Sequence, residues 1–229
     1  MKFSLVFHAA LLLFTLPVIS QNAAVIRKNA ETYDQTIFSR SKKIVDALSI
    51  ADSSQAIRLI EIVSDEYKNL NNIYSLRDVL VKMNKENSGS LQNDSIKNEL
   101  SKIIAVTSFK TDSLHKIYIS KLTKNLNAQQ VDQVKDGMTY GIVKVTYNGY
   151  NQMIQTLTEE QKKQIMLWLV EARELAMDAE SSEKKHAWFG KYKGRINNYL
   201  SAAGYDLKKE GEDWQKRIKA AADQNKPLQ

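Results

Sequence analysis

The sequence predicts an all-α protein, a multi-helix bundle of about seven to eight helices. Apolar residues recur at helical spacing along most of the 229-residue chain. The two prolines, Pro17 and Pro227, lie near the ends, so none between them breaks a helix. Three short polar sequences have the pattern of a helix-capping box. Seven of the eight glycines fall between residues 137 and 211, which predicts tight turns mainly in the second half.

The first twenty residues have the pattern of an export signal. Lys2 provides a basic start, Leu5 to Leu16 a mostly apolar run, and Val18-Ile19-Ser20 a cleavage pattern. We expect a cut after Ser20 and a periplasmic or secreted protein. The apolar run is short and no second one follows, which predicts no integral membrane span. The chain has no cysteine, so disulfides and thiol catalysis are excluded.

Residues 21–229 are expected to form a single helical domain, long enough to bury one sizeable core or two lobes. The formal net charge is +7, from 33 basic and 26 acidic residues that alternate along the chain. Such alternation is typical of solvated helix surfaces, and a nucleic-acid partner is therefore not expected. The sequence does not indicate an oligomeric state.

In the first half, one helix is expected from about Glu31 to Leu48 and a second from Asp52 to about Met83. Asp52-Ser-Ser-Gln55 has the capping-box pattern before the second helix. The following segment, 84–112, is predicted to be a flexible or variable insertion, because residues 84–94 are rich in Asn, Ser and Lys. A weaker helical pattern resumes within it, an interruption is expected near 109–112, and another helix follows.

In the second half, Asn127-Ala-Gln-Gln130 and Thr158-Glu-Glu-Gln161 are capping boxes that open two further helices, ending near residues 137 and 178. The segment 138–150 gives mixed signals, because its β-branched residues suit a strand and its neighbours suggest helix; it is predicted to be helical or irregular. A helix restarts at Ser181 or Ser182, Gly204 suits a left-handed cap, and residues 206–222 form the last helix.

The stretch from His186 to Asp206 concentrates aromatic rings, basic side chains and amides, and is the best candidate for a binding surface. On a helical wheel, four residues form one stripe: Trp188, Tyr192, Arg195 and Tyr199. The stripe joins an apolar arc formed by Phe189, Ile196, Leu200 and Ala203. Arg195 lies inside this wide apolar face, where it needs a carboxylate, backbone carbonyls or a ligand.

One interpretation of this stretch is a sugar site, because sugar rings stack on aromatic side chains and their hydroxyls need fixed hydrogen-bonding groups. The candidate ligand-binding residues are Tyr140, Tyr147, Trp188, Lys191, Tyr192, Arg195, Asn198, Tyr199 and Asp206. The alternative is that the aromatic residues are core and that an acid of a neighbouring helix satisfies Arg195. Residue chemistry alone favours this alternative.

No motif indicates catalysis, a metal or a cofactor, and we assign no catalytic residue. Glu171, Glu174 and Asp178 share one helix face and could, with His186, hydrolyse a glycan or bind a metal. They lie opposite the apolar face of their helix, so a solvated acidic face is the favoured interpretation. The spacing of Gly190 and Gly194 favours close packing against another helix.

Four segments of the chain resemble a bacterial family, domain of unknown function 3826. They are Val134 to Tyr147, Leu157 to Gln161, Glu171 to Asp178, and Lys185 to Asp206, and the resemblance extends over about residues 40–220. It implies an exported, mainly helical protein that binds sugars in bacteria that forage on polysaccharides. It supplies no catalytic residues.

A weaker resemblance is to periplasmic helical chaperones and metal-stress proteins with Leu-Thr-x-x-Gln motifs. Leu157-Thr-Glu-Glu-Gln161 fits this motif, and Leu126-Asn-Ala-Gln-Gln130 fits it except for its asparagine. A capping box explains both sequences without a shared function. The leading hypothesis is thus an exported, non-enzymatic protein that binds oligosaccharides and serves polysaccharide utilisation. The alternatives are a helical chaperone and a glycan-active hydrolase.

Overall fold

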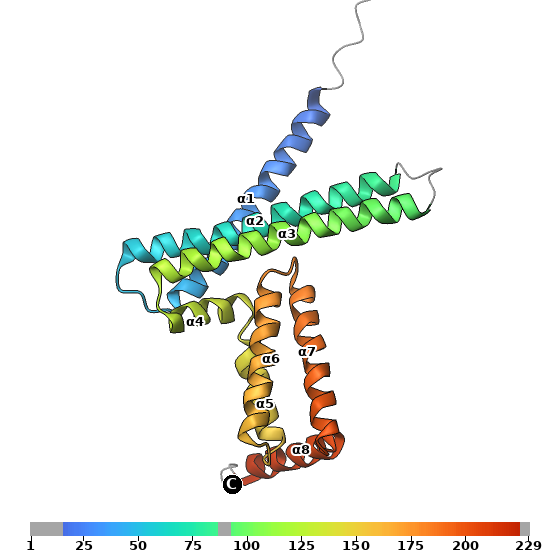
Figure 1. Ribbon diagram of the computed structural model, residues 1–229. Helices are drawn as coiled ribbons and strands as arrows, with labels where there is room; N and C mark the ends of the chain where they lie inside the picture. The colour runs from blue at the N-terminus through green and yellow to red at the C-terminus, as the bar shows by residue number, and fades with distance from the viewer. Residues whose placement is uncertain (1–15, 87–92, 225–229) are drawn as a thin grey trace, which may run out of the picture.

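The computed structural model describes residues 16–86 and 93–224, and within these ranges the chain forms eight α-helices and no strand (Figure 1). The all-α prediction is confirmed. The helices are α1 (Leu16–Asp46), α2 (Ser53–Glu86), α3 (Asn93–Asn125), α4 (Ala128–Met138), α5 (Ile142–Met153), α6 (Glu159–Met177), α7 (Ser182–Ala202) and α8 (Leu207–Gln224). In the part of the chain so described, no helix is long and apolar enough to cross a membrane.

The helices form two lobes (Figure 1). In the N-terminal lobe, α2 and α3 form a long antiparallel hairpin that α1 crosses, and α4 lies beside it. In the C-terminal lobe, α6 and α7 are antiparallel neighbours, α5 lies beside α6, and α8 runs across their far end. The turn between α6 and α7 meets the α2–α3 hairpin, where the Tyr74 hydroxyl donates to the Asp178 carbonyl at 2.8 Å.

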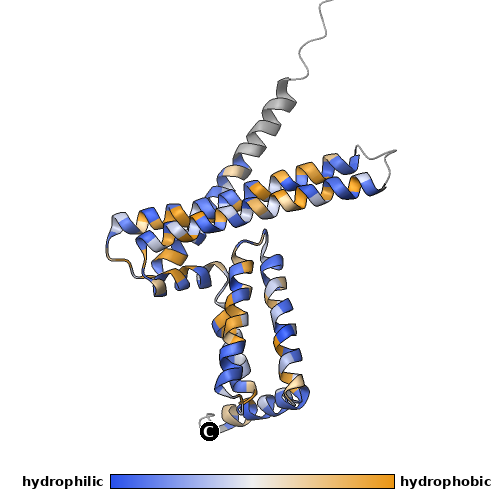
Figure 2. Cartoon of the chain, viewed as in Figure 1, coloured by the Kyte–Doolittle hydropathy of each residue, from blue (hydrophilic) through white to orange (hydrophobic). Residues whose placement is uncertain are grey.

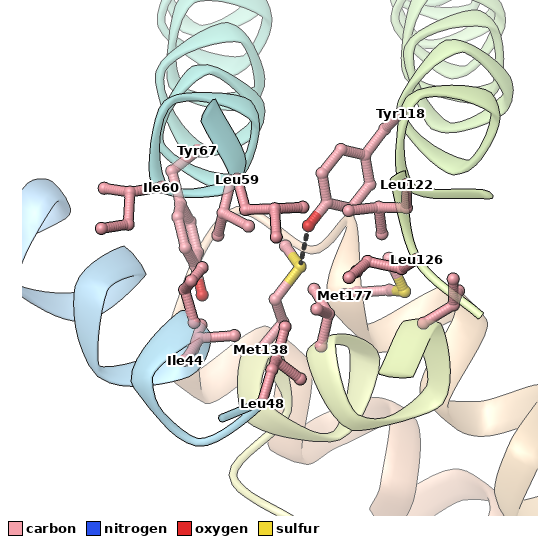
Figure 3. Close-up of a cluster of buried hydrophobic side chains, with 14 of the residues drawn as sticks. Ile44, Leu48, Leu59, Ile60, Tyr67, Tyr118, Leu122, Leu126, Met138 and Met177 are labelled. Carbon is pink, nitrogen blue, oxygen red and sulfur yellow. Dashed lines mark hydrogen bonds between the residues drawn. The ribbon is translucent and has the colours of Figure 1, made fainter. Parts of the chain in front are cut away.

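Each lobe has its own hydrophobic core. The N-terminal core draws buried side chains from α1 to α4, and inside it the Tyr118 hydroxyl lies 3.2 Å from the sulfur of Met138 (Figure 3). The C-terminal core is built by α5, α6 and α7, around Ile165, Phe189 and Ile196. Burial of one such side chain contributes about 1.5–3 kcal/mol. Met177, at the end of α6, belongs to the N-terminal core, so α6 takes part in both.

Most of the helix caps predicted from the sequence are present in the structure. Both capping boxes of the second half form, with reciprocal bonds between Asn127 and Gln130 and between Thr158 and Gln161. Gly204 has a left-handed φ of 94°, as expected after α7. The capping box predicted for Asp52 and Gln55 forms in part: Asp52 caps α2 by accepting from the Ser54 amide, whereas the Gln55 side chain donates to the Asn125 carbonyl and ties α2 to the end of α3.

Two further segments differ from the expectation. The interruption predicted near 109–112 is wrong, because α3 continues through it and Thr111 bonds back to the carbonyls of Thr107 and Ser108. The helical pattern is weak there because that part of α3 is largely exposed, and Phe109 keeps 73% of its surface. Within 138–150, helix α5 begins at Ile142, after Tyr140 and Gly141 with φ of 61° and 65°.

The segment predicted to be an insertion, 84–112, lies in the far half of the α2–α3 hairpin. Residues 84–86 and 93–112 are helical, whereas 87–92 lie outside the described residues. This half of the hairpin projects beyond α1, and hydrophobic residues alternate with hydrophilic ones along it (Figure 2). Several of its apolar side chains are exposed. They are Leu76, Val79, Leu80, Met83, Ile104, Val106 and Phe109. That the segment is variable stays a prediction.

Candidate functional site

The candidate site lies along one flank of the antiparallel pair α6 and α7. There the side chains of the two helices meet in a surface that we term the aromatic strip. It consists of Trp168 and Glu171 of α6 and Trp188, Lys191, Tyr192, Arg195 and Tyr199 of α7. The α7 residues recur at helical spacing, and at about 1.5 Å per residue the strip extends roughly 16 Å from Trp188 to Tyr199.

Arg195 is the centre of the strip. Its guanidinium carbon lies 4.5 Å from the centre of the Trp168 ring, and its Nη1 lies 3.6 Å from a carboxylate oxygen of Glu171. Tyr199 meets the same Trp168 ring edge to face, with ring centres 5.3 Å apart. Arg195 and Glu171 both keep 54% of their side-chain surface exposed, so this ion pair adds little stability and its groups can reach a ligand.

Tyr192 and Trp188 continue the strip toward the start of α7. Tyr192 is buried, and burial, together with a hydrogen bond to the Glu171 carboxylate, raises the pKa of its hydroxyl to about 12. The hydroxyl therefore remains a donor over the whole physiological range. Trp188 is half-buried, and the Lys191 ammonium lies 5.1 Å from the centre of its ring. Cation–π contacts at such exposed sites contribute about 0.5–1 kcal/mol.

The expectation for Arg195 was wrong in one respect. It was placed inside an apolar face, but it lies at the solvent edge, because Tyr192 and the adjoining arc of Phe189, Ile196 and Leu200 face the core and Arg195 does not. Of the three kinds of partner anticipated for it, a carboxylate is present, that of Glu171. Trp168 is a partner that the sequence did not place in the site. The helical period of α6 places Trp168 on the apolar side of that helix. Only the antiparallel pairing of α6 with α7 brings Trp168 next to Arg195.

Four of the nine candidate residues lie outside the strip. Tyr140 stacks on His186 with ring centres 5.6 Å apart, next to the turn between α4 and α5. Tyr147 packs against the C-terminal core from α5. Asn198 is exposed on α7, and Asp206 caps α8 by accepting from the Lys208 and Lys209 amides at 3.1 Å.

Gly190 and Gly194 do not pack closely against another helix, contrary to the expectation. A Cβ atom at either position would meet no atom within 4 Å. Both glycines are exposed, because α7 meets α6 through its opposite, apolar face.

Two of the three carboxylates assigned to a solvated face are instead part of the contact between the lobes. Asp178 lies 2.8 Å from His115 Nδ1, and Glu174 lies 3.8 Å from His115 Nε2. Glu174 also pairs with Lys135 at 2.7 Å. The solvated-face prediction is therefore wrong for Glu174 and Asp178, since helices α3 and α4 cover them. The sequence missed His115 as their partner because it lies on a helix of the other lobe.

Two more ionisable groups are buried beside this histidine. Glu66 and Lys185 expose only 2% and 4% of their surface. The Lys185 ammonium donates to the Ala176 and Met177 carbonyls at 3.1 and 2.7 Å, which satisfies the end of α6. We term the six residues Glu66, His115, Lys135, Glu174, Asp178 and Lys185 the polar joint.

The surroundings of the polar joint alter its titration. Burial and the nearby Asp178 raise the pKa of Glu66 to about 8, and burial lowers the pKa of Lys185 to about 8. The hydrogen bond to Asp178 raises the pKa of His115, which favours its cationic form. Because the two nitrogens of His115 face different carboxylates, these groups do not converge on one point. Over the described residues, no group of three or more acidic or histidine side chains could hold a metal ion.

The chain was compared with known proteins. A sequence profile described as "Protein of unknown function (DUF3826)" matches residues 34–220. No curated protein matches the chain.

Proposed function

The chain belongs to the DUF3826 family, and on the geometry of its aromatic strip we propose that it binds glycan fragments. The observation that carries this proposal is the arrangement of Arg195 between the Trp168 ring and the Glu171 carboxylate. It sets a fixed cation and a fixed acceptor beside half-exposed aromatic rings. This combination suits a ligand that has both apolar faces and hydroxyl groups.

The shape of the strip favours an oligosaccharide over a single sugar. Its aromatic groups are spread along roughly 16 Å of α7, estimated from the helical rise. Two of the rings are each accompanied by a cation: Trp168 by Arg195, and Trp188 by Lys191. A chain of sugars laid along α7 would meet these groups in succession.

We further propose that the protein acts after export, in the periplasm or outside the cell, and that it binds without catalysis. The export signal predicted over residues 1–20 supports the first point. The engagement of Glu174 and Asp178 with His115 and Lys135 supports the second, because a hydrolase needs its carboxylates free to reach a glycosidic bond.

The proposal is tested by titrating the protein with plant and host oligosaccharides while its tryptophan fluorescence is recorded. Arg195→Ala should weaken binding at least about tenfold, the effect of losing one charged hydrogen bond, while the circular dichroism spectrum stays unchanged. Arg58→Ala, at an exposed position of the other lobe, is the matched control and should bind normally. A saturable response that Arg195→Ala leaves intact, or no saturable response to any oligosaccharide, would contradict the proposal.

One observation favours a second candidate function, a periplasmic chaperone. The far half of the α2–α3 hairpin exposes a run of apolar side chains that could hold unfolded clients. This function predicts that substoichiometric protein suppresses the aggregation of a heated client enzyme. Leu76→Ser combined with Val106→Ser should remove the suppression while glycan binding by the other lobe persists.

A further inference from the structure

The C-terminal lobe contains a recess that lies on the other side of α7 from the aromatic strip. It has a volume of about 360 Å³ and opens to solvent between α5, α7 and α8. Lys193 and Asn197 of α7 line it and lie roughly 140° around the helix, on average, from Trp188 and Tyr192. The remaining lining residues are Thr146, Gly149, Tyr150 and Met153 of α5 and Trp214 of α8.

One wall of the recess is aromatic and apolar. Tyr150 is buried, and Trp214 is half-buried on α8. Arg217, one turn beyond Trp214, donates to the carbonyls of Gln152 and Met153 at 3.0 and 2.8 Å, the last carbonyls of α5. This bond fixes α8 against the end of α5, and it therefore holds the Trp214 ring in place over the recess.

The other wall carries hydrogen-bond donors that have few acceptors within the described part of the protein. The Tyr150 hydroxyl donates to the Asn197 side-chain oxygen at 2.6 Å, which orients the amide and leaves its NH₂ group available. Thr146 differs from other threonines in the described helices, such as Thr107 and Thr123, whose hydroxyls bond back to their own helix. Within the described part of the chain, Thr146 makes no such bond and Lys193 makes no ion pair.

The charge of the recess is positive. Lys193 contributes an ammonium group, and no carboxylate is among the lining residues. A complementary ligand combines an apolar face for Trp214, hydroxyls for Asn197 and Thr146, and an anionic group for Lys193. A pyranose ring that bears a carboxylate meets all three requirements, whereas a neutral sugar leaves the ammonium without a partner.

We propose that this recess binds a uronic acid residue, a carboxylated sugar. The carboxylate pairs with Lys193, the ring packs on Trp214, and the hydroxyls accept from Asn197 and Thr146. This site is separate from the aromatic strip. Binding at either site can therefore be disproved while binding at the other is confirmed. If both sites are occupied by one polysaccharide, that polysaccharide is acidic.

Gly149 provides a direct way to test the recess. It lies in the recess, and a Cβ atom there would meet no atom within 4 Å. A long side chain at this position can therefore fill the recess without displacing protein atoms. Replacing a helical glycine also favours α5, by about 0.5–1 kcal/mol, so Gly149→Met should fold at least as well as the native chain.

The experiment is calorimetric titration of the full chain with glucuronate and galacturonate, and with glucose and galactose as neutral counterparts. We expect saturable binding of at least one uronate, at least about tenfold weaker binding of its neutral counterpart, and a loss of binding in Gly149→Met. Lys193→Gln should weaken uronate binding at least about tenfold, the scale of one charge-assisted hydrogen bond. Lys184→Gln, an exposed lysine near the start of α7, is the matched control.

The proposal is overturned by no saturable binding of either uronate, by equal binding of the neutral sugar, or by undiminished binding in a folded Gly149→Met protein. Thermal unfolding of each variant shows that it is folded. Arg195→Ala should keep its uronate affinity, because Arg195 belongs to the aromatic strip. If Arg195→Ala and Gly149→Met lose the same binding, the two surfaces are not separate sites and the proposal fails.

Discussion

The aromatic strip and the polar joint use the same kinds of charged residues in opposite ways. In the strip, the side chains of Arg195 and Glu171 are each 54% exposed, and their ion pair contributes little to the stability of the fold. In the joint, Glu66 and Lys185 are almost fully buried, and removing the Lys185 cation leaves Asp178 without its compensation. A charge can therefore serve binding where it is solvated, and it becomes part of the structure where neighbouring helices cover it. Four substitutions test this contrast.

The largest effect is expected from Lys185→Ala. The substitution removes the donor to the Ala176 and Met177 carbonyls and the buried cation beside Asp178. Breaking a buried charged network typically costs about 3–5 kcal/mol. Urea unfolding should show a loss of this size, whereas Lys184→Ala, at an exposed position, should change stability by less than about 0.5 kcal/mol. Equal effects of the two substitutions would contradict the contrast.

Glu66→Gln should stabilise the folded protein, whereas Lys185→Ala destabilises it. The pKa of Glu66 is raised from 4.5 to about 8, so its neutral form is favoured in the folded state. The stability that it contributes is fully present below pH 4.5 and is lost as the pH rises toward 8. Glutamine does not titrate, and the variant should be more stable than the native protein by about 2–3 kcal/mol at pH 7.

The extra stability of Glu66→Gln should shrink when unfolding is measured at pH 4, because the side chain at position 66 is then neutral in both proteins. Glu61→Gln, at an exposed position of the same helix, is the matched control. A Glu66→Gln protein that is less stable at pH 7 would mean that the Glu66 carboxylate is ionised in the folded state.

A smaller, pH-dependent effect is expected from His115→Gln. The hydrogen bond to Asp178 raises the pKa of His115, so its contribution is fully present below pH 6.5 and is lost as the pH rises through the folded value. The variant should be less stable by roughly 1–2 kcal/mol at pH 6, the value of a hydrogen bond between charged groups, and by less at pH 9. His186→Gln, at a histidine whose ring stacks on Tyr140, is the matched control.

The smallest effect on stability is expected from Arg195→Ala. The substitution removes one exposed cation–π contact and one long ion pair, together worth less than about 1 kcal/mol. The melting temperature should thus change little, although glycan binding is lost. If instead the variant unfolds as readily as Lys185→Ala, the strip is structural and the binding proposal loses its support.

Local signals in the sequence predicted the fold well. The capping boxes at Asn127 and Thr158 and the turn at Gly204 depend on residues within a few positions of each other, and all three are present. The continuity of α3 could not be predicted, because its far half is exposed and lacks a regular apolar pattern. Gln55 bonds to Asn125, a residue seventy positions away, which no local pattern reveals.

The candidate site was predicted in part, for the same reason. The stripe of Trp188, Tyr192, Arg195 and Tyr199 follows from the helical period alone. Trp168 and Glu171 complete it only because α6 runs antiparallel beside α7. The polar joint depends on contacts between α2, α3, α4, α6 and α7. A helical wheel of α6 alone places Glu174 and Asp178 on a free face.

Helix α6 limits how the chain can be divided. In chain order, the N-terminal lobe ends with α4 and the C-terminal lobe begins with α5. Met177 of α6 nevertheless packs among the buried side chains of the N-terminal lobe, which include Met138 and Tyr118 (Figure 3). A fragment that ends at residue 140 would lose Met177 and leave His115 without Glu174 and Asp178. A fragment that starts there would expose Met177 to water. Neither half contains all the side chains that its own interior requires, because Met177 of α6 belongs to the N-terminal core.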